Sequence, residues 1–106
     1  MPKRTPPTYP RYARIAGRLG SRIKAARLRR RLSQIEMAER MGVDRNTVMS
    51  LERGDLSVGL GVLVRALGVM GLEDDLDALA AEDEVGRLLA DAAATPRRRA
   101  RRSGTE

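Results

Sequence analysis

The sequence contains no cysteine, histidine, phenylalanine or tryptophan. The lack of cysteine excludes disulfides and thiol chemistry, and the lack of both cysteine and histidine excludes the usual zinc sites and Cys/His nucleophiles. Leu, Val, Ile, Met and Ala must therefore build the core. This composition favours small packed helices over a β-sandwich, because β-branched and aromatic runs are scarce. With no convincing strand in the sequence, we expect an all-α protein.

Long apolar runs are also missing. The basic start, MPKRTPPTYPRY, is not followed by the apolar run of a signal peptide, and the longest apolar stretch, residues 58–72, is interrupted by Arg65 and several glycines. We expect no membrane segment and a cytoplasmic, nucleoid-associated protein. The acidic residues at 73–84 lack the central glycine of a calcium loop, and GRLGS at 17–21 lacks the lysine of a phosphate loop. We therefore expect no catalytic residue, no metal and no cofactor.

The net charge of +7 is unevenly distributed along the chain. Residues 1–32 carry eleven Lys/Arg and no acid, whereas residues 33–95 carry five bases and thirteen acids. Five further arginines follow Pro96. Two cationic segments thus flank an acidic body, which indicates a polyanion partner at the ends and a different partner in the middle.

Hydrophobic periodicity predicts five or six short helices. The first covers residues 13–30 and has a very basic outer face. The second begins at Ser33, which forms a capping box with Glu36, and carries Ile35, Ala38 and Met41 on one face. A fourth helix is expected after a cap at Ser57, with an apolar stripe of Leu60, Leu63, Val64 and Leu67 on one face. Two further helices are expected at 73–81 and at 84–94.

The second and third helices are separated by only three or four residues. Gly42 supplies a left-handed turn, Asp44 caps the third helix at residues 45–53, and Gly54 ends it. Such a pair is a helix-turn-helix. Ala38 is small where the two helices cross, and the other inward positions are apolar: Met37, Met41, Val43, Val48 and Leu51.

Polar residues remain on the outer face of the third helix, and these are the candidate DNA-binding residues: Arg45, Asn46, Thr47, Ser50 and Arg53. Arginine and asparagine pair with guanine and adenine edges in the major groove. Gln34, at the start of the second helix, is a candidate phosphate ligand. The alternative is a merely solvated helix face, which the filled turn pattern and the basic arms disfavour.

Residues 19–72 resemble the Cro/repressor-type, or XRE, helix-turn-helix family. The matching residues are IKAAR at 23–27, LSQ at 32–34, Ala38, Gly42, Val43, Thr47, Val48 and LERG at 51–54. The resemblance implies a lambda-repressor-like bundle in which Arg27 and Glu52 form a buried ion pair between the first and third helices. It assigns helix-turn-helix structural roles to Arg27, Ala38, Gly42, Val48, Leu51 and Glu52. Arg31 departs from the family, because many members carry glycine there and a left-handed turn would strain an arginine.

The chain beyond the helix-turn-helix is similar to HipB-type antitoxins in GDLSVGLGVLVRALGVMGLEDDLDAL, DEVGRLLADA and PRRRARR. This implies a homodimeric transcriptional repressor that binds its own double-stranded operator and neutralises a HipA-like kinase toxin. Two alternatives stay open. One is a stand-alone XRE repressor without a toxin, and the other is a basic protein-interaction adaptor.

The sequence predicts four segments. We expect a flexible basic arm at residues 1–12, the DNA-binding domain at 13–72, an acidic helical extension for dimer or partner contact at 73–95, and a disordered Arg-rich tail at 96–106. Five leucines are either a dimer contact or part of the monomer core: Leu72, Leu76, Leu79, Leu88 and Leu89.

Overall fold

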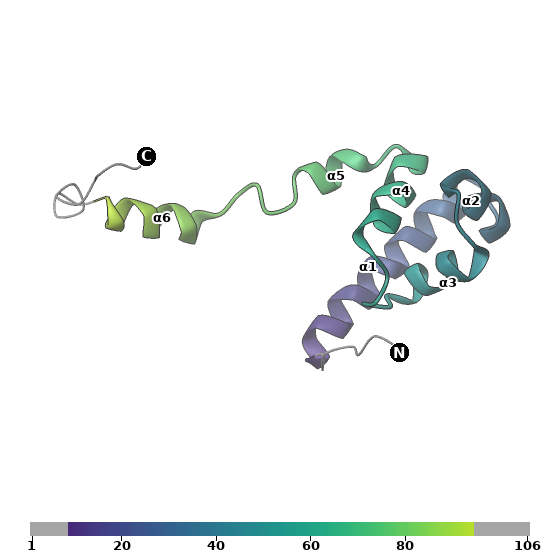
Figure 1. The fold of residues 1–106 in the computed structure, drawn as a ribbon, viewed down its shortest axis with the longest axis horizontal. Helices are drawn as coiled ribbons and strands as arrows, with labels where there is room; N and C mark the ends of the chain where they lie inside the picture. Colours follow the sequence, from purple (N-terminus) through teal and green to yellow (C-terminus); the bar gives the residue numbers. More distant parts are fainter. Residues whose placement is uncertain (1–8, 95–106) are drawn as a thin grey trace, which may run out of the picture. The chain divides into compact units, whose positions relative to one another are not determined.

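The computed structural model describes residues 9–94 of the 106-residue chain. This part contains no strand and folds into six helices: α1 (Pro10–Arg29), α2 (Gln34–Met41), α3 (Arg45–Arg53), α4 (Leu60–Met70), α5 (Glu73–Asp77) and α6 (Glu84–Ala93) (Figure 1). The expected all-α bundle is confirmed. The expected arginine tail at 96–106 and residues 1–8 of the expected arm lie outside the described residues.

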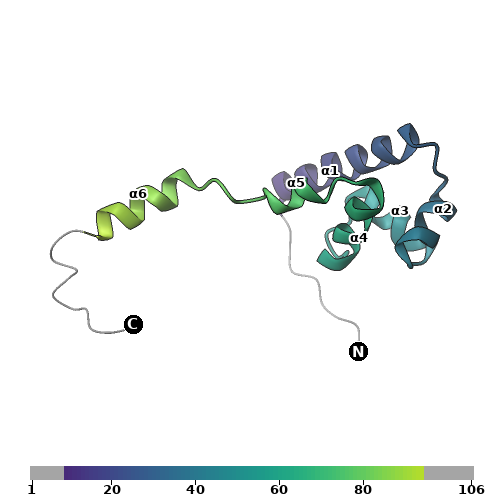
Figure 2. The ribbon, with the colours of Figure 1, turned by 90° about the horizontal axis from the view of Figure 1, so that it is seen from above.

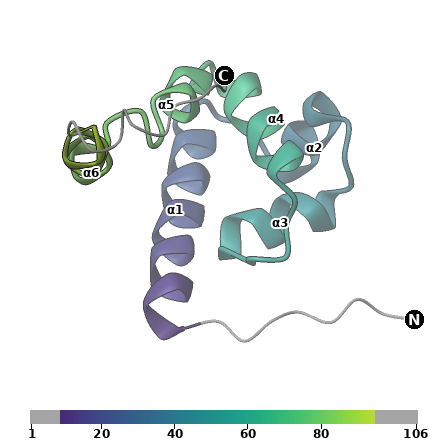
Figure 3. The ribbon, with the colours of Figure 1, turned by 60° about the vertical axis from the view of Figure 1, so that its left-hand side comes forward.

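The chain divides into two units, the first ending at Leu76 and the second beginning at Asp77. Within the first unit, α1 runs along one side, and α2, α3 and α4 are grouped beside it (Figures 2 and 3). The second unit contains α6, a helix with no buried residue. The site described below lies entirely within the first unit.

Aliphatic side chains and methionines form the core, as the lack of Phe and Trp requires. Met37 is completely buried, and it is among the largest side chains in the interior. Partly buried Leu72 and Leu76 pack against this core, whereas Leu79, Leu88 and Leu89 are exposed. The buried hydrophobic residues are Ile23, Ala26, Leu32, Met37, Ala38, Met41, Val48, Leu51, Ala66, Leu67 and Met70.

Two apolar positions differ from the expected pattern. Ile35, predicted on the inner face of α2, is 55% exposed, because α2 turns Met37, Ala38 and Met41 toward the core instead. Leu60, at the start of the stripe predicted for α4, is 68% exposed. The buried face of α4 consists of Ala66, Leu67 and Met70, so the expected stripe is rotated relative to the core.

Several helix ends also differ from the expected ones. α1 starts at Pro10, three residues before the predicted start, because proline is well suited to the first helical position. The prediction of Ser57 as a cap is wrong: Gly59 is the N-cap of α4, and the Ser57 backbone N–H and hydroxyl both donate to Asp55 Oδ1, at 2.9 and 2.7 Å. α5 ends at Asp77 rather than at residue 81.

None of the helices in the described part of the chain combines the length and hydrophobicity needed to cross a membrane.

Candidate nucleic-acid interface

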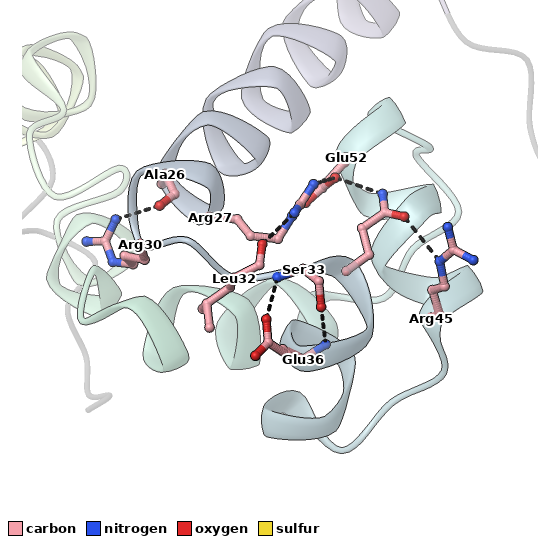
Figure 4. A network of polar contacts seen from close by, with 9 residues as sticks. Ala26, Arg27, Arg30, Leu32, Ser33, Glu36, Arg45 and Glu52 are labelled. Atoms are coloured by element: carbon pink, nitrogen blue, oxygen red, sulfur yellow. Dashed lines mark hydrogen bonds and ion pairs between the residues drawn. The ribbon is translucent and has the colours of Figure 1, made fainter.

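A buried ion pair joins α1 to α3. Arg27 Nε lies 2.6 Å from Glu52 Oε2, and Arg27 Nη2 donates to Glu52 Oε1 at 3.1 Å (Figure 4). The third donor, Arg27 Nη1, bonds to the Leu32 carbonyl at 2.7 Å. The two charged side chains are only 6% and 4% exposed, so their charges compensate each other away from water. The ion pair that the family resemblance implied is therefore present.

The same two helices touch backbone to backbone at a pair of glycines. A Cβ on Gly20 of α1 would lie 2.5 Å from the Glu52 carbonyl oxygen, and one on Gly54 would lie 2.5 Å from the Ala16 carbonyl oxygen. Neither position has room for a side chain. The sequence predicts for Gly54 only the role of ending α3 and predicts no role for Gly20, because no local pattern reveals a close approach between distant segments.

Local signals hold α2 in place at both ends. The Glu36 N–H donates to Ser33 Oγ at 3.0 Å and the Ser33 N–H to Glu36 Oε1 at 2.8 Å, so the predicted capping box is confirmed. Two hydrogen bonds lower the pKa of Glu36 below its ordinary value: the larger effect comes from the Ser33 backbone N–H and the smaller from the Ser33 hydroxyl. At the other end, Gly42 adopts φ 73° and the Val43 N–H bonds back to the Ala38 carbonyl at 3.0 Å.

The turn places α3 with one face inward and one outward. Val48, Leu51 and Glu52 are buried, whereas Arg45, Asn46 and Arg53 are exposed. The other two candidates, Thr47 and Ser50, are half-buried, and so is Met49. Asp44 occupies the predicted N-cap position but makes no side-chain cap hydrogen bond.

Gln34 has a role that sequence reasoning missed. Its Nε2 donates to Glu52 Oε1 at 3.2 Å, and its Oε1 accepts a hydrogen bond from Arg45 Nε at 3.3 Å. The amide therefore links the buried ion pair to the first residue of α3. From the sequence, Gln34 is expected only as a phosphate ligand, because its position at a helix start gives no information about contacts with α3.

A polar cleft of about 240 Å³ lies beside the outer face of α3. Asn46, Thr47 and Ser50 line it from the helix, and Asp55 and Ser57 line it from the following loop. Two hydrogen bonds from Ser57 lower the pKa of Asp55: the larger effect comes from the Ser57 hydroxyl and the smaller from its backbone N–H. Amide and hydroxyl groups of this cleft therefore surround the middle of α3 with hydrogen-bonding partners.

The exposed arginines of α3, Arg45 and Arg53, form no ion pair in the part of the chain that the structure describes. Within residues 9–94, the ion pairs are Arg27 with Glu52 and Arg87 with Glu82. Arg53 donates to the neutral Ser50 hydroxyl, at 3.2 Å. An exposed helix face with two guanidinium groups outside these ion pairs and an asparagine matches the chemistry that reads base edges and binds phosphates.

The sequence model of the helix-turn-helix family matches residues 23–76, slightly more than half of the chain. The chain belongs to the helix-turn-helix family. It is a DNA-binding, XRE-type transcription regulator, and the family consists of DNA-binding rather than catalytic domains. No curated protein matches the chain.

Proposed function

We propose that the protein is a sequence-specific transcriptional repressor that reads its operator with α3. The observation that carries this proposal is the placement of Arg45 and Asn46, exposed at the start of a helix whose inner face is held by a buried ion pair. Bidentate contacts from these two residue types distinguish guanine and adenine in the major groove. Thr47, Ser50 and Arg53 would add contacts along the same helix, and Gln34 would hold Arg45.

The repressor binds as a two-fold dimer in this proposal. One recognition helix reads too few base pairs for useful specificity, so two domains would occupy half-sites about 34–36 Å apart. An exposed apolar face on α6 supports self-association, since Val85, Leu88 and Leu89 are each about two-thirds exposed. Sedimentation of the protein with an operator carrying one or two half-sites measures the stoichiometry, and a monomer on each would contradict the dimer.

The test of base reading compares Arg45→Ala and Asn46→Ala with Arg40→Ala, an exposed arginine of α2 outside the outer face of α3. Each α3 substitution should weaken the free energy of binding to the selected operator by about 1–3 kcal/mol and relax the preference at particular base pairs. Arg40→Ala should leave the preferences unchanged. Equal losses of Arg45→Ala on operator and random DNA would show that the assigned face does not read bases.

A second function, that of an antitoxin against a HipA-like kinase, is supported by the composition of the extension. Residues 72–86 carry seven acids and no base, which makes them a poor surface for phosphates. The triple variant Asp74→Asn/Asp75→Asn/Asp77→Asn should therefore inhibit the kinase less than the wild-type protein, while its operator binding persists. If the wild-type protein neither binds nor inhibits the kinase, the protein is a stand-alone repressor.

A further inference from the structure

An open cleft of about 870 Å³ lies between α1 and the C-terminal end of α3. Three arginines of α1 line it, Arg14, Arg18 and Arg22, and Arg53 lines it from α3. All four are exposed. The cleft is distinct from the polar cleft at Asn46 and Ser50, and only Arg53 belongs both to this cleft and to the outer face of α3.

The cleft has an excess of positive charge. No ion pair within residues 9–94 involves any of the four arginines. The one acid that lines the cleft is Glu52, and its charge is already balanced by Arg27 at 2.6 Å. Four guanidinium groups therefore border an open space, and their summed positive potential attracts a polyanion.

The spacing of the α1 arginines fits an extended polyanion better than a small one. Steps of four residues advance along a helix by about 6 Å, so the three guanidinium groups start from points spread over about 12 Å. One DNA strand advances about 3.4 Å per nucleotide along its axis, so this span corresponds to three or four nucleotides. Gly17 borders open space in the cleft, because a Cβ added there would have no atom within 4 Å.

We propose that this cleft holds the sugar–phosphate backbone of the DNA next to the groove that α3 enters. The inference rests on the proposed function and assigns α1 a part in it. Arg14, Arg18 and Arg22 contact phosphates and carry no sequence information, whereas Arg45 and Asn46 read bases. Arg53 joins the two surfaces, so the bound strand passes from the outer face of α3 into the cleft. The bound DNA is therefore longer than the segment that α3 alone would cover.

The test replaces the cleft arginines with Arg14→Gln/Arg18→Gln/Arg22→Gln in the full chain. The matched control is Arg29→Gln/Arg40→Gln/Arg87→Gln, which removes the same charge from exposed positions outside the cleft. Fluorescence anisotropy with operator and random duplexes is measured over a salt series. Loss of three phosphate contacts should lower both affinities about tenfold or more and make the log–log salt slope shallower by about 2.7. Base preferences should stay unchanged, and the control should change little.

Phosphate ethylation interference gives an independent readout. The wild-type protein should show sensitive phosphates flanking each half-site that the cleft variant lacks and the control variant keeps. Thermal melting checks the fold of each variant. If the triple variant melts early, Arg18→Gln alone should still lower the salt slope by about 0.9.

Several outcomes would overturn the inference. Equal losses of DNA affinity in the cleft and control variants would show a net-charge effect. Unchanged DNA binding in the cleft variant would show that the cleft does not bind the DNA backbone. A cleft variant that keeps DNA binding but loses affinity for an acidic peptide of residues 72–86 would identify a protein ligand instead. These failures differ from failure of the proposed function, in which the wild-type protein itself would show no base preference that Arg45→Ala alters.

Discussion

Arg45 Nε, at the first position of α3, donates a hydrogen bond across 3.3 Å to Oε1 of Gln34, at the first position of α2. Gln34 in turn donates to Glu52, whose carboxylate is held by Arg27 (Figure 4). A continuous set of polar contacts thus runs from the interior to an exposed arginine. Gln34 contacts Glu52 through its Nε2 and Arg45 through its Oε1, so it helps to fix the direction in which the Arg45 side chain extends.

We therefore expect energetic coupling between Gln34 and Arg45 in operator binding. A double-mutant cycle with Gln34→Ala and Arg45→Ala should give a coupling energy of about 0.5–3 kcal/mol, because the two side chains are in direct contact. The control cycle pairs Gln34→Ala with Arg53→Ala, which makes no hydrogen bond to Gln34 within the described residues. That cycle should be additive within about 0.5 kcal/mol. Additivity in both cycles would mean that the contact does not position Arg45.

Breaking the ion pair between α1 and α3 should strongly destabilise the fold. Arg27→Met leaves the Glu52 carboxylate buried without its cation, and we expect it to lower the free energy of unfolding by about 3–5 kcal/mol. The double variant Arg27→Met/Glu52→Leu should recover most of this loss, because no charge is then left unpaired. Urea unfolding measures both. A double variant as unstable as Arg27→Met would show that packing, rather than charge, causes the loss.

Arg31 adopts the left-handed conformation, with φ 56°, at the position where the family resemblance implied a glycine. A residue with a Cβ is strained there by about 1–2 kcal/mol, so Arg31→Gly should raise the free energy of unfolding by up to about 1 kcal/mol after the entropic cost of glycine. Arg29→Gly removes the same charge two residues earlier, at the last residue of α1. That control should instead destabilise by up to about 1 kcal/mol. A melting temperature that falls in both variants would contradict the inferred backbone strain at Arg31.

The capping box makes stability depend on pH. Because the hydrogen bonds from Ser33 favour the ionised carboxylate, the pKa of Glu36 is lowered from 4.5 in the folded chain. Its contribution to stability is present above pH 4.5 and is lost as the pH falls through the lower folded value. Glu36→Gln keeps a capping partner but cannot ionise, so it should lower the melting temperature at pH 7 and lower it less at pH 3. Glu39→Gln, an exposed control on the same helix, should show no such difference between the two pH values.

Apart from the Arg27–Glu52 ion pair, which the family resemblance implied, the features predicted correctly from the sequence are those that depend on neighbours in the chain. Ser33 and Glu36 are three residues apart, and a hydroxyl and a carboxylate at that spacing satisfy each other's backbone N–H groups wherever the helix lies. Gly42 and Gly54 end their helices at φ 73° and 78° for a similarly local reason. Such signals were enough to predict the helix-turn-helix and which face of α3 is exposed.

The features that were missed depend on segments far apart in the chain. Ile35 and Met37 are both apolar, and only the position of α2 against α3 and α4 decides that Met37 is buried and Ile35 is not. Ser57 is a local exception: it had the residue type of a cap, but Asp55, two residues earlier, accepts both of its donors. The contacts of Gln34 likewise require that the starts of α2 and α3 lie side by side, which periodicity does not specify.

The contact between Gly20 and Gly54 has a consequence for how operator specificity changes. Because a single methyl group at either position would collide with backbone 2.5 Å away, any larger residue requires α3 to shift against α1. If α3 reads bases as proposed, such a shift changes which base pairs Arg45 and Asn46 can reach, although neither residue has been altered. We therefore expect that a substitution on the inner side of α3, away from the DNA, can change operator specificity.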